Sequence, residues 1–335
     1  MFHAYASTAA AKPFEPIEFD PGPLGDGRVE IAVKSCGICH SDLSMLDNEW
    51  GITKYPFVGG HEVVGTVAAV GEHVPNVKVG DVVGLGWFAG SCMHCRTCLS
   101  GHHNLCPTAE QTIVHRHGGF ADRVRCHWSW AIKLPAALDP VKAGPMFCGG
   151  ITVFNPIVQH RVPPTARVGV IGIGGLGHLA IRFLNKWGCE VTAFSTSADK
   201  EPEARELGAH HFVNTKAKGA LEKIAGSLDF ILNTANAGLD WDAYLAVLAP
   251  RGVLHTVGVV GNTFGAKQVF PMIGGQKTLS ASPLGSPATV ADMLDFCARH
   301  GIEPVTEVFP MSRINDAFEH LRAGKARYRL VLTAD

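Results

Sequence analysis

The segment from Cys36 to Glu62 contains side chains that can bind a metal ion. It holds the run Cys-Gly-Ile-Cys-His-Ser-Asp and, after a loop, Gly-Gly-His-Glu. Cys39 and His61 offer a thiolate and an imidazole, which are good zinc ligands, and Asp42 can orient a ligating imidazole. Two ligands are too few for zinc, and Cys148 is the best candidate for a third. Three protein ligands would leave one position open for water or substrate, as catalytic zinc requires.

Taken alone, these residues also allow a different interpretation. Cys39 is the kind of small thiol that proteins bury as an apolar group, and His61 is equally compatible with a hydrogen-bonded core histidine. If a metal is bound, Ser41 places a hydroxyl beside it.

A second set of cysteines predicts a closed metal site. Two residues separate the first from the second and the second from the third, and seven separate the third from the fourth: Cys92, Cys95, Cys98 and Cys106. Four thiolates complete the tetrahedral coordination of a structural zinc ion. An iron–sulfur cluster is the main chemical alternative, followed by disulfide pairing. The remaining cysteines lack partners at ligand spacing and are expected to be buried thiols: Cys36, Cys126, Cys189 and Cys297.

Length and composition favour a globular protein of two domains. The chain has 335 residues, 46% hydrophobic and 18% charged, with a net charge of -1. The charge pattern shows no basic patch for nucleic acid, and no apolar run is long enough to cross a membrane. The chain starts without the basic and apolar regions of a secretory signal, and its cysteines are clustered. These features predict a reducing, cytoplasmic location.

The first half of the chain is expected to be rich in β-structure. Residues 28–34 alternate between apolar and polar side chains, and residues 63–70 and 81–85 also read as strands. Glycine-rich turns separate them, and few helical patterns intervene. Short strands with such turns predict a barrel-like domain.

The second half carries a pattern typical of dinucleotide binding. An apolar strand over residues 167–171 runs into Gly172-Ile-Gly174-Gly175-Leu176-Gly177, and an amphipathic helix and a strand over 191–194 follow. The glycines permit a tight turn, a close approach of pyrophosphate and close packing of helix against strand. The helix N-terminus supplies N–H groups for the phosphates.

The end of that following strand favours NADP(H) over NAD(H). NAD sites normally carry a carboxylate there for the ribose hydroxyls. This chain has Ser195, Thr196 and Ser197, with Lys200 just beyond, so hydroxyls and an ammonium would accept a 2′-phosphate.

The rest of the second half alternates between strands and helices. Strands are predicted over 209–214, 228–233, 252–257 and 277–282, and helices over 219–225, 240–249 and 288–300. Residues 307–310 and 328–332 return to strand character and are expected to rejoin the first domain.

Several motifs together resemble one enzyme family. They are residues 36–42, 48–51, 60–62, the four-cysteine loop, 148–152, the glycine turn and 327–331. The chain resembles the zinc-dependent medium-chain alcohol dehydrogenases, and within them it is similar to the cinnamyl alcohol dehydrogenases and the bacterial NADP-dependent aldehyde reductases. The match covers nearly the whole chain.

The resemblance implies a two-domain α/β fold with a GroES-like catalytic domain and a Rossmann domain with a doubly wound parallel sheet. The expected limits are 1–148 for the catalytic domain, 149–283 for the NADP-binding domain and 284–335 for the return to the catalytic domain. It implies two zinc ions, the catalytic one on Cys39, His61 and Cys148, with Glu62 able to approach it. It also implies a homodimer. Further cofactor contacts are expected at His40, Thr152, Val257, Gly258, Ser282 and Arg329.

The implied reaction is reversible hydride transfer between NADPH and aromatic or medium-chain aldehydes, with zinc as Lewis acid. Trp50, Trp87 and Phe88 are candidates for an apolar substrate pocket, or else core residues. In this family a proton relay leads from a hydroxyl, matched by Ser41, to a histidine three residues on. Ser44 stands there, so either Ser44 with water or another histidine completes the path. The stretch between Glu110 and Gly118 is shorter than in the plant enzymes.

Other functions remain open at this stage. A polyol or other secondary-alcohol dehydrogenase of the same zinc family is the main alternative. A non-catalytic NADP-binding relative would have lost a zinc ligand, and none is lost. A zinc-free quinone reductase would lack both cysteine sets.

Overall fold

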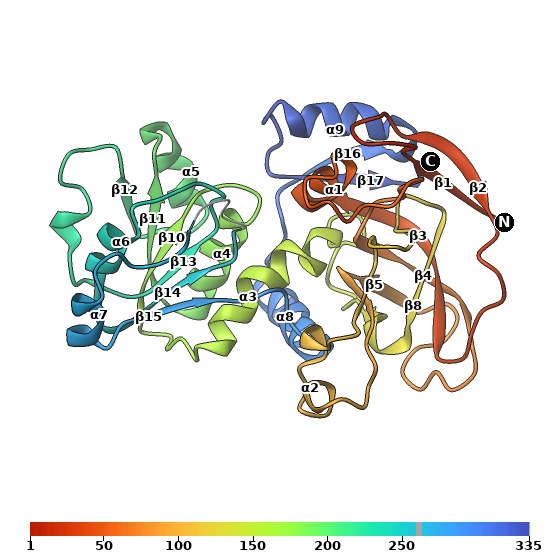
Figure 1. Ribbon diagram of the computed structural model, residues 1–335, viewed down its shortest axis with the longest axis horizontal. Coiled ribbons are helices and arrows are strands. Elements are labelled where there is room, and N and C mark those ends of the chain that lie inside the picture. Colours follow the sequence, from red (N-terminus) through yellow and green to blue (C-terminus); the bar gives the residue numbers. More distant parts are fainter. Residues whose placement is uncertain (259–262, 335) are drawn as a thin grey trace. The chain divides into compact units, whose positions relative to one another are not determined.

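A computed structural model describes residues 1–258 and 263–334 of the chain. It divides into two compact units (Figure 1). The first comprises Met1–Ile151 and Leu284–Asp335, and the second comprises Thr152–Pro283.

The first unit is built on a seven-stranded sheet in the order β16-β17-β3-β4-β5-β9, with β8 paired to β3. Its strands are β3 (Arg28–Ile38), β4 (Glu62–Val70), β5 (Val82–Leu85), β8 (Arg123–His127), β9 (Ile132–Lys133), β16 (Thr306–Pro310) and β17 (Arg329–Thr333). Two small two-stranded sheets pair β1 (Phe2–Ala6) with β2 (Glu15–Phe19) and β6 (Phe88–Gly90) with β7 (Glu110–Gln111).

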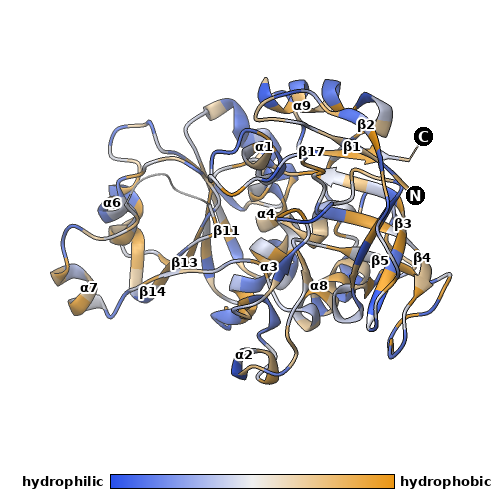
Figure 2. Ribbon diagram, turned by 45° about the vertical axis from the view of Figure 1, so that its right-hand side comes forward, coloured by the Kyte–Doolittle hydropathy of each residue, from blue (hydrophilic) through white to orange (hydrophobic). Residues whose placement is uncertain are grey.

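The long strand β3 holds this unit together, because it pairs with β4, β8 and β17. Its apolar side chains and those of β4 are largely buried, and orange segments along the strands of this unit are visible in Figure 2. The C-terminal strand β17 pairs antiparallel with β3 and so belongs to the sheet of the first unit. The helices of the unit are short apart from α8: α1 (His40–Leu46), α2 (Arg96–Leu99), α8 (Pro287–His300) and α9 (Ile314–Arg322).

The second unit contains a six-stranded parallel sheet in the order β12-β11-β10-β13-β14-β15. Its strands are β10 (Arg167–Ile171), β11 (Glu190–Ser195), β12 (His211–Asn214), β13 (Leu228–Asn233), β14 (Leu248–Thr256) and β15 (Thr278–Ala281). Its helices are α4 (Gly177–Trp187), α5 (Glu201–Glu206), α6 (Trp241–Val247) and α7 (Phe270–Gly275), and α3 (Gly149–Gln159) contains the boundary between the units. From β10 the chain first adds strands on one side of the sheet (β11, β12) and then on the other (β13, β14, β15). This strand order is that of a dinucleotide-binding Rossmann sheet and confirms the predicted fold class.

The helix predicted over 219–225 is wrong. Only a 3-10 turn, Glu222–Ile224, forms there. Gly219 and Gly226 adopt φ of 72° and 68°, so left-handed backbone ends the segment on both sides. What remains between them is too short for a stable α-helix. Among the described residues, no helix is long and apolar enough to span a membrane.

Candidate functional site

Three chain segments bring the predicted catalytic ligands together in the first unit. Cys39 lies between β3 and α1, His61 and Glu62 lie at the start of β4, and Cys148 immediately precedes α3. One ligand atom from each of these four residues lies within 4.8 Å of the others, and all four residues are buried.

The spacing of the donor atoms fits zinc. The Sγ atoms of Cys39 and Cys148 are 3.8 Å apart, and Nε2 of His61 is 3.3 Å from Sγ of Cys148. Tetrahedral coordination with Zn–S of about 2.3 Å and Zn–N of about 2.0 Å separates such donors by roughly 3.5 to 3.8 Å. The soft thiolates and the imidazole are the donor set that zinc prefers.

Asp42 orients the ligating residues through hydrogen bonds. Its fully buried carboxylate accepts hydrogen bonds from the backbone N–H of Cys39 (2.9 Å) and of Gly60 (2.8 Å), and lies 3.1 Å from Nδ1 of His61. A carboxylate is an acceptor, so Nδ1 carries the proton and Nε2 is left with a lone pair toward the sulfur atoms. Asp42 therefore fixes the tautomer of His61 that binds metal.

The thiols and the imidazole of this cluster have shifted pKa values. A hydrogen bond with Cys148 lowers the pKa of the Cys39 thiol well below its usual value, and the same contact and burial raise the pKa of Cys148. Burial opposes protonation of His61, but Asp42 raises its pKa well above the ordinary value. Thiols and imidazoles release their protons when they bind a divalent cation, so metal binding at this cluster would depend on pH.

Glu62 forms a buried ion pair with Arg329. Nη2 of Arg329, from β17, donates to Oε1 of Glu62, while Oε2 of Glu62 has no hydrogen-bond partner among the described residues. Burial raises the pKa of the Glu62 carboxyl to about 7, although Arg329 opposes the shift. A Cβ at position 37 would lie 2.0 Å from Oε2 of Glu62, so the close approach of this carboxylate requires Gly37. Arg329, predicted as a cofactor residue, lies against the metal-ligand cluster.

The two serines of the predicted relay have different surroundings. Oγ of Ser41 lies 3.8 Å from Sγ of Cys39, which places the hydroxyl beside the cluster as expected. Ser44 is buried and its Oγ donates to Oε2 of Glu49 at 2.7 Å. Glu49 is exposed, so Ser44 connects the interior of the unit to a carboxylate in solvent.

Of the three aromatic candidates, two lie near the cluster. The ring of Trp87 packs edge-on against His61 with centroids 5.0 Å apart, and Trp50 packs edge-on against Trp87 at 6.0 Å. Phe88 is buried and packs against Trp130, so it belongs to the core.

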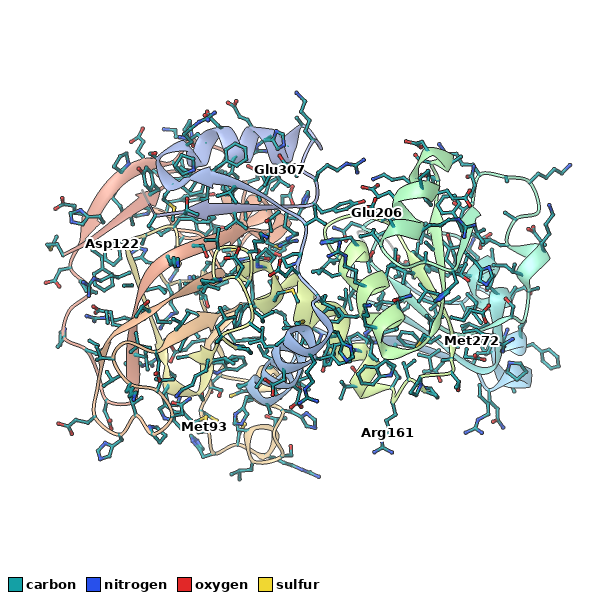
Figure 3. All side chains as sticks on the ribbon, turned by 180° about the vertical axis from the view of Figure 1, so that it is seen from behind. Met93, Asp122, Arg161, Glu206, Met272 and Glu307 are labelled. Carbon is teal, nitrogen blue, oxygen red and sulfur yellow. The ribbon has the colours of Figure 1, made fainter. Side chains whose placement is uncertain are left out.

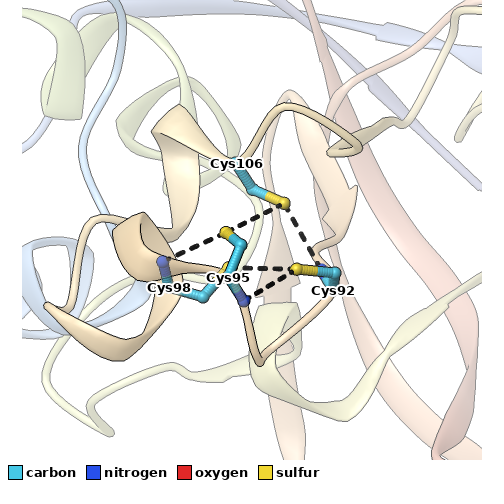
Figure 4. A group of neighbouring side chains, drawn as sticks. All are labelled: Cys92, Cys95, Cys98 and Cys106. Carbon is cyan, nitrogen blue, oxygen red and sulfur yellow. Dashed lines mark hydrogen bonds between the residues drawn. The ribbon is translucent and has the colours of Figure 1, made fainter.

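The four cysteines of the second set surround a common point, as Figure 4 shows. Sγ of Cys92 is 3.9 Å from Sγ of Cys98, and Sγ of Cys95 is 3.9 Å from Sγ of Cys106. These separations again match a tetrahedral zinc–thiolate site. None of the ten cysteines forms a disulfide, which removes that alternative. Met93, labelled in Figure 3, lies in this loop.

In the second unit, the glycine turn leaves space for a cofactor. Gly172 adopts φ of 89°, and a Cβ at Gly177 would lie 1.9 Å from the carbonyl oxygen of Gly172. A Cβ at Gly174 would meet nothing within 4 Å, so the backbone is open there to an approaching phosphate. Gly175 and Leu176 are half-buried in the same turn.

The hydroxyls predicted to select NADP(H) follow β11. Ser195 is half-buried, Thr196 and Ser197 are exposed, and Oγ of Ser195 accepts a hydrogen bond from the backbone N–H of Ser197 at 3.1 Å. Nζ of Lys200 lies 3.2 Å from Oε2 of Glu203, an acid that the prediction overlooked.

The remaining predicted cofactor residues come from four separate segments of the chain. His40 is exposed at the start of α1, Thr152 is half-buried in α3, and Val257 and Gly258 follow β14. Oγ of Ser282 lies 3.0 Å from Nε2 of the buried His255.

The sequence alone did not reveal three contacts made by the predicted site residues. They are the hydrogen bond of Ser44 to Glu49, the ion pair of Lys200 with Glu203, and the ion pair of Glu62 with Arg329. The spacing of Lys200 and Glu203 on one helical turn could have revealed the second pair. The pairing of Glu62 with Arg329 joins residues 267 positions apart and leaves no local signal.

Comparison with known proteins places these features in context. Residues 25–136 match the family described as "Alcohol dehydrogenase GroES-like domain", and residues 175–299 match "Zinc-binding dehydrogenase". The aldehyde reductase AdhA of Synechocystis sp. is 56% identical over 99% of both chains, and the aldehyde reductase YahK of Escherichia coli is 36% identical over 98% of this chain and 97% of its own.

Solved structures show the same likeness. A cinnamyl alcohol dehydrogenase from Sorghum bicolor superimposes with a TM-score of 0.93 and 36% identity, over 99% of this chain and 97% of that one. The Helicobacter pylori enzyme "CAD", solved with NADP(H), gives a TM-score of 0.89 and 29% identity over the same shares.

Proposed function

The chain belongs to the zinc-binding alcohol dehydrogenase family, and we propose that it works as an NADP(H)-dependent aldehyde reductase. The cluster of Cys39, His61 and Cys148 carries this proposal, because three ligands at zinc spacing leave a coordination position for a substrate oxygen. The 56% identity to an aldehyde reductase over the full length supports the substrate class.

When bound at these sites, zinc supplies a Lewis acid and NADPH a hydride. The residues of the chain then have distinct tasks. Asp42 holds His61 in its ligating tautomer, Arg329 balances the charge of Glu62, and the hydroxyl of Ser41 can give a proton to a reduced substrate oxygen. Trp87, beside His61, and Trp50 present apolar surface that suits an aromatic or aliphatic aldehyde.

Removing the Ser41 hydroxyl should slow the reaction. Ser41→Ala is expected to lower kcat by about 10² to 10⁴, the range typical of a lost general acid–base step. Zinc content by elemental analysis and NADPH affinity by fluorescence titration should stay near those of the unmodified enzyme. An unchanged kcat would remove Ser41 from the mechanism.

Ser44 provides the comparison. Ser44→Ala should be milder, because Ser44 only links the interior to Glu49 and solvent. Ser44→His should raise alcohol oxidation near neutral pH and add a step near the histidine pKa to the pH profile. If neither the rate nor the profile changes, the proton leaves by another route.

The cofactor preference should depend on Ser195. The unmodified enzyme should have the higher kcat/KM with NADPH, and Ser195→Asp should shift the preference toward NADH because a carboxylate repels the 2′-phosphate. Ser195→Asn is the matched control, because asparagine has nearly the same size as aspartate but carries no charge. Comparable kcat/KM values for the two cofactors in the unmodified enzyme would contradict this assignment.

A cytoplasmic homodimer completes the proposal. All ten cysteines are free of disulfides, which suits a reducing compartment. Val269, Phe270 and Ile273 are largely exposed on and beside α7, and a second copy would cover such an apolar patch. A mass of one chain by light scattering would exclude the dimer.

A substrate panel tests the activity as a whole. Aromatic and medium-chain aldehydes should be reduced with NADPH at higher kcat/KM than ketoses or mannitol are turned over. A plant mannitol dehydrogenase from Petroselinum crispum is 37% identical to this chain, which makes polyol oxidation the second candidate. A higher kcat/KM with mannitol than with the aldehydes would identify the enzyme as a polyol dehydrogenase instead.

A further inference from the structure

A cavity of about 540 Å³ opens in the first unit, and none of the zinc-cluster residues line it. It lies between the β1–β2 hairpin and the strands β3 and β8, whose positions Figure 1 shows. Its volume is within the range of small-molecule sites, which is roughly 300 to 1,000 Å³.

Four arginines line this cavity, and two glutamates neutralise only part of their charge. Arg28 and Arg116 both pair with Glu110, at 2.7 and 2.6 Å. A second carboxylate, that of Glu30, forms ion pairs with the other two arginines: Arg123 at 2.6 Å and Arg125 at 2.9 Å. Asp20 also lines the cavity and accepts a hydrogen bond from the backbone N–H of Gly22.

Arg123 and Arg116 have N–H groups that remain available to a ligand. Each guanidinium has five N–H groups, and a side chain that shares one carboxylate with another arginine cannot use them all. Among the residues that the structure describes, Arg123 donates one side-chain hydrogen bond, to Glu30, and its side chain remains 42% exposed. Nε of Arg116 is buried and has no acceptor among the described residues. Burial lowers the pKa of Arg116 despite Glu110, and Arg28 lowers it further.

An aromatic surface adjoins the guanidinium groups. The rings of Phe2 and Phe19 pack edge to face with centroids 5.6 Å apart, and Phe19 packs against His117 at 4.4 Å. Arg125 lies over the ring of Phe2 at 5.2 Å. All of these residues line the cavity, so a charged wall and an apolar wall face the same space.

We propose that this cavity binds one small aromatic carboxylate per chain, with its carboxylate on Arg123 and its ring against Phe19. The planar guanidinium fork matches a carboxylate, and the exposed part of Phe19 offers a face for a ring. Arg125 is not free for this role, because it also donates to the carbonyl oxygens of Pro21 and Gly22 and holds the loop.

Isothermal titration of the zinc-loaded enzyme saturated with NADPH tests the proposal, with trans-cinnamate, the neutral cinnamamide and inorganic phosphate as probes. Cinnamate should bind once per chain and more tightly than the other two. Arg123→Gln should weaken its binding about tenfold or more, the loss of one charged hydrogen bond. Phe19→Leu should weaken it about fivefold.

Arg313→Gln is the matched control, because Arg313 is an exposed arginine that pairs with Asp316 and does not line the cavity. It should leave cinnamate binding unchanged, and Arg123→Gln should leave kcat/KM for aldehyde reduction unchanged. The proposal fails if cinnamate does not bind, if Arg123→Gln binds it as well as the unmodified enzyme does, or if cinnamamide or phosphate binds equally well. Binding that is competitive with aldehyde and insensitive to Arg123→Gln would assign the ligand to the zinc site instead.

Discussion

Replacing Cys148 with serine is expected to lower kcat/KM for aldehyde reduction by about a thousandfold or more. A neutral serine hydroxyl is a poor zinc ligand, and Lewis-acid activation contributes several kcal/mol, with each 1.36 kcal/mol equal to about tenfold in rate. Steady-state kinetics with NADPH and a fixed aldehyde measure the loss. The thermal midpoint should change much less, because the fold of the first unit does not depend on an open site.

Cys189→Ser is the matched control. Cys189 is also buried, and its thiol donates to the carbonyl oxygen of Pro163 at 3.5 Å, a contact that a serine hydroxyl can keep. Its kcat/KM should stay within a few-fold of the unmodified enzyme. Near-normal activity of Cys148→Ser would show that Cys148 is not a ligand of the catalytic metal.

The opposite pattern is expected for the four-cysteine loop. Cys92→Ser should cost about 4 kcal/mol of folding free energy, because a closed structural zinc contributes directly to folding. For a domain of this size that corresponds to a fall in Tm of roughly 10 °C. Calorimetry measures the fall, and kcat per folded molecule should drop less than tenfold.

Two outcomes would contradict this expected loss of stability. If Cys92→Ser melts at the temperature of the unmodified protein and of Cys189→Ser, the loop does not depend on a metal. Full loss of kcat with an unchanged Tm would instead move this cluster into the chemistry.

Much of the fold could be predicted because local patterns and global topology agree. The apolar strand before Gly172 and the amphipathic helix after Gly177 form β10 and α4, and alternation of strands and helices produces a parallel sheet. The segment 219–225 was the exception, since glycines at each end adopt left-handed backbone that a helical pattern does not reveal.

The candidate metal residues could be found because thiols and imidazoles are few and their spacing is informative. What spacing cannot give is the set of contacts between distant segments. The pairing of Glu62 with Arg329 arises only when β17 joins β3 beside β4, and the arginines of the cavity meet only when β8 pairs with β3. Ser44 and Glu49 are near in sequence, but their contact depends on where α1 ends.

The most direct test of the two-site account is the zinc content of freshly purified protein, measured by elemental analysis against protein concentration. We expect two zinc ions per chain in the unmodified enzyme and one in each of Cys148→Ser and Cys92→Ser, with activity retained only where Cys148 is intact. One zinc ion or none in the unmodified chain, or two in either variant, would contradict the division of the seven ligands into three and four.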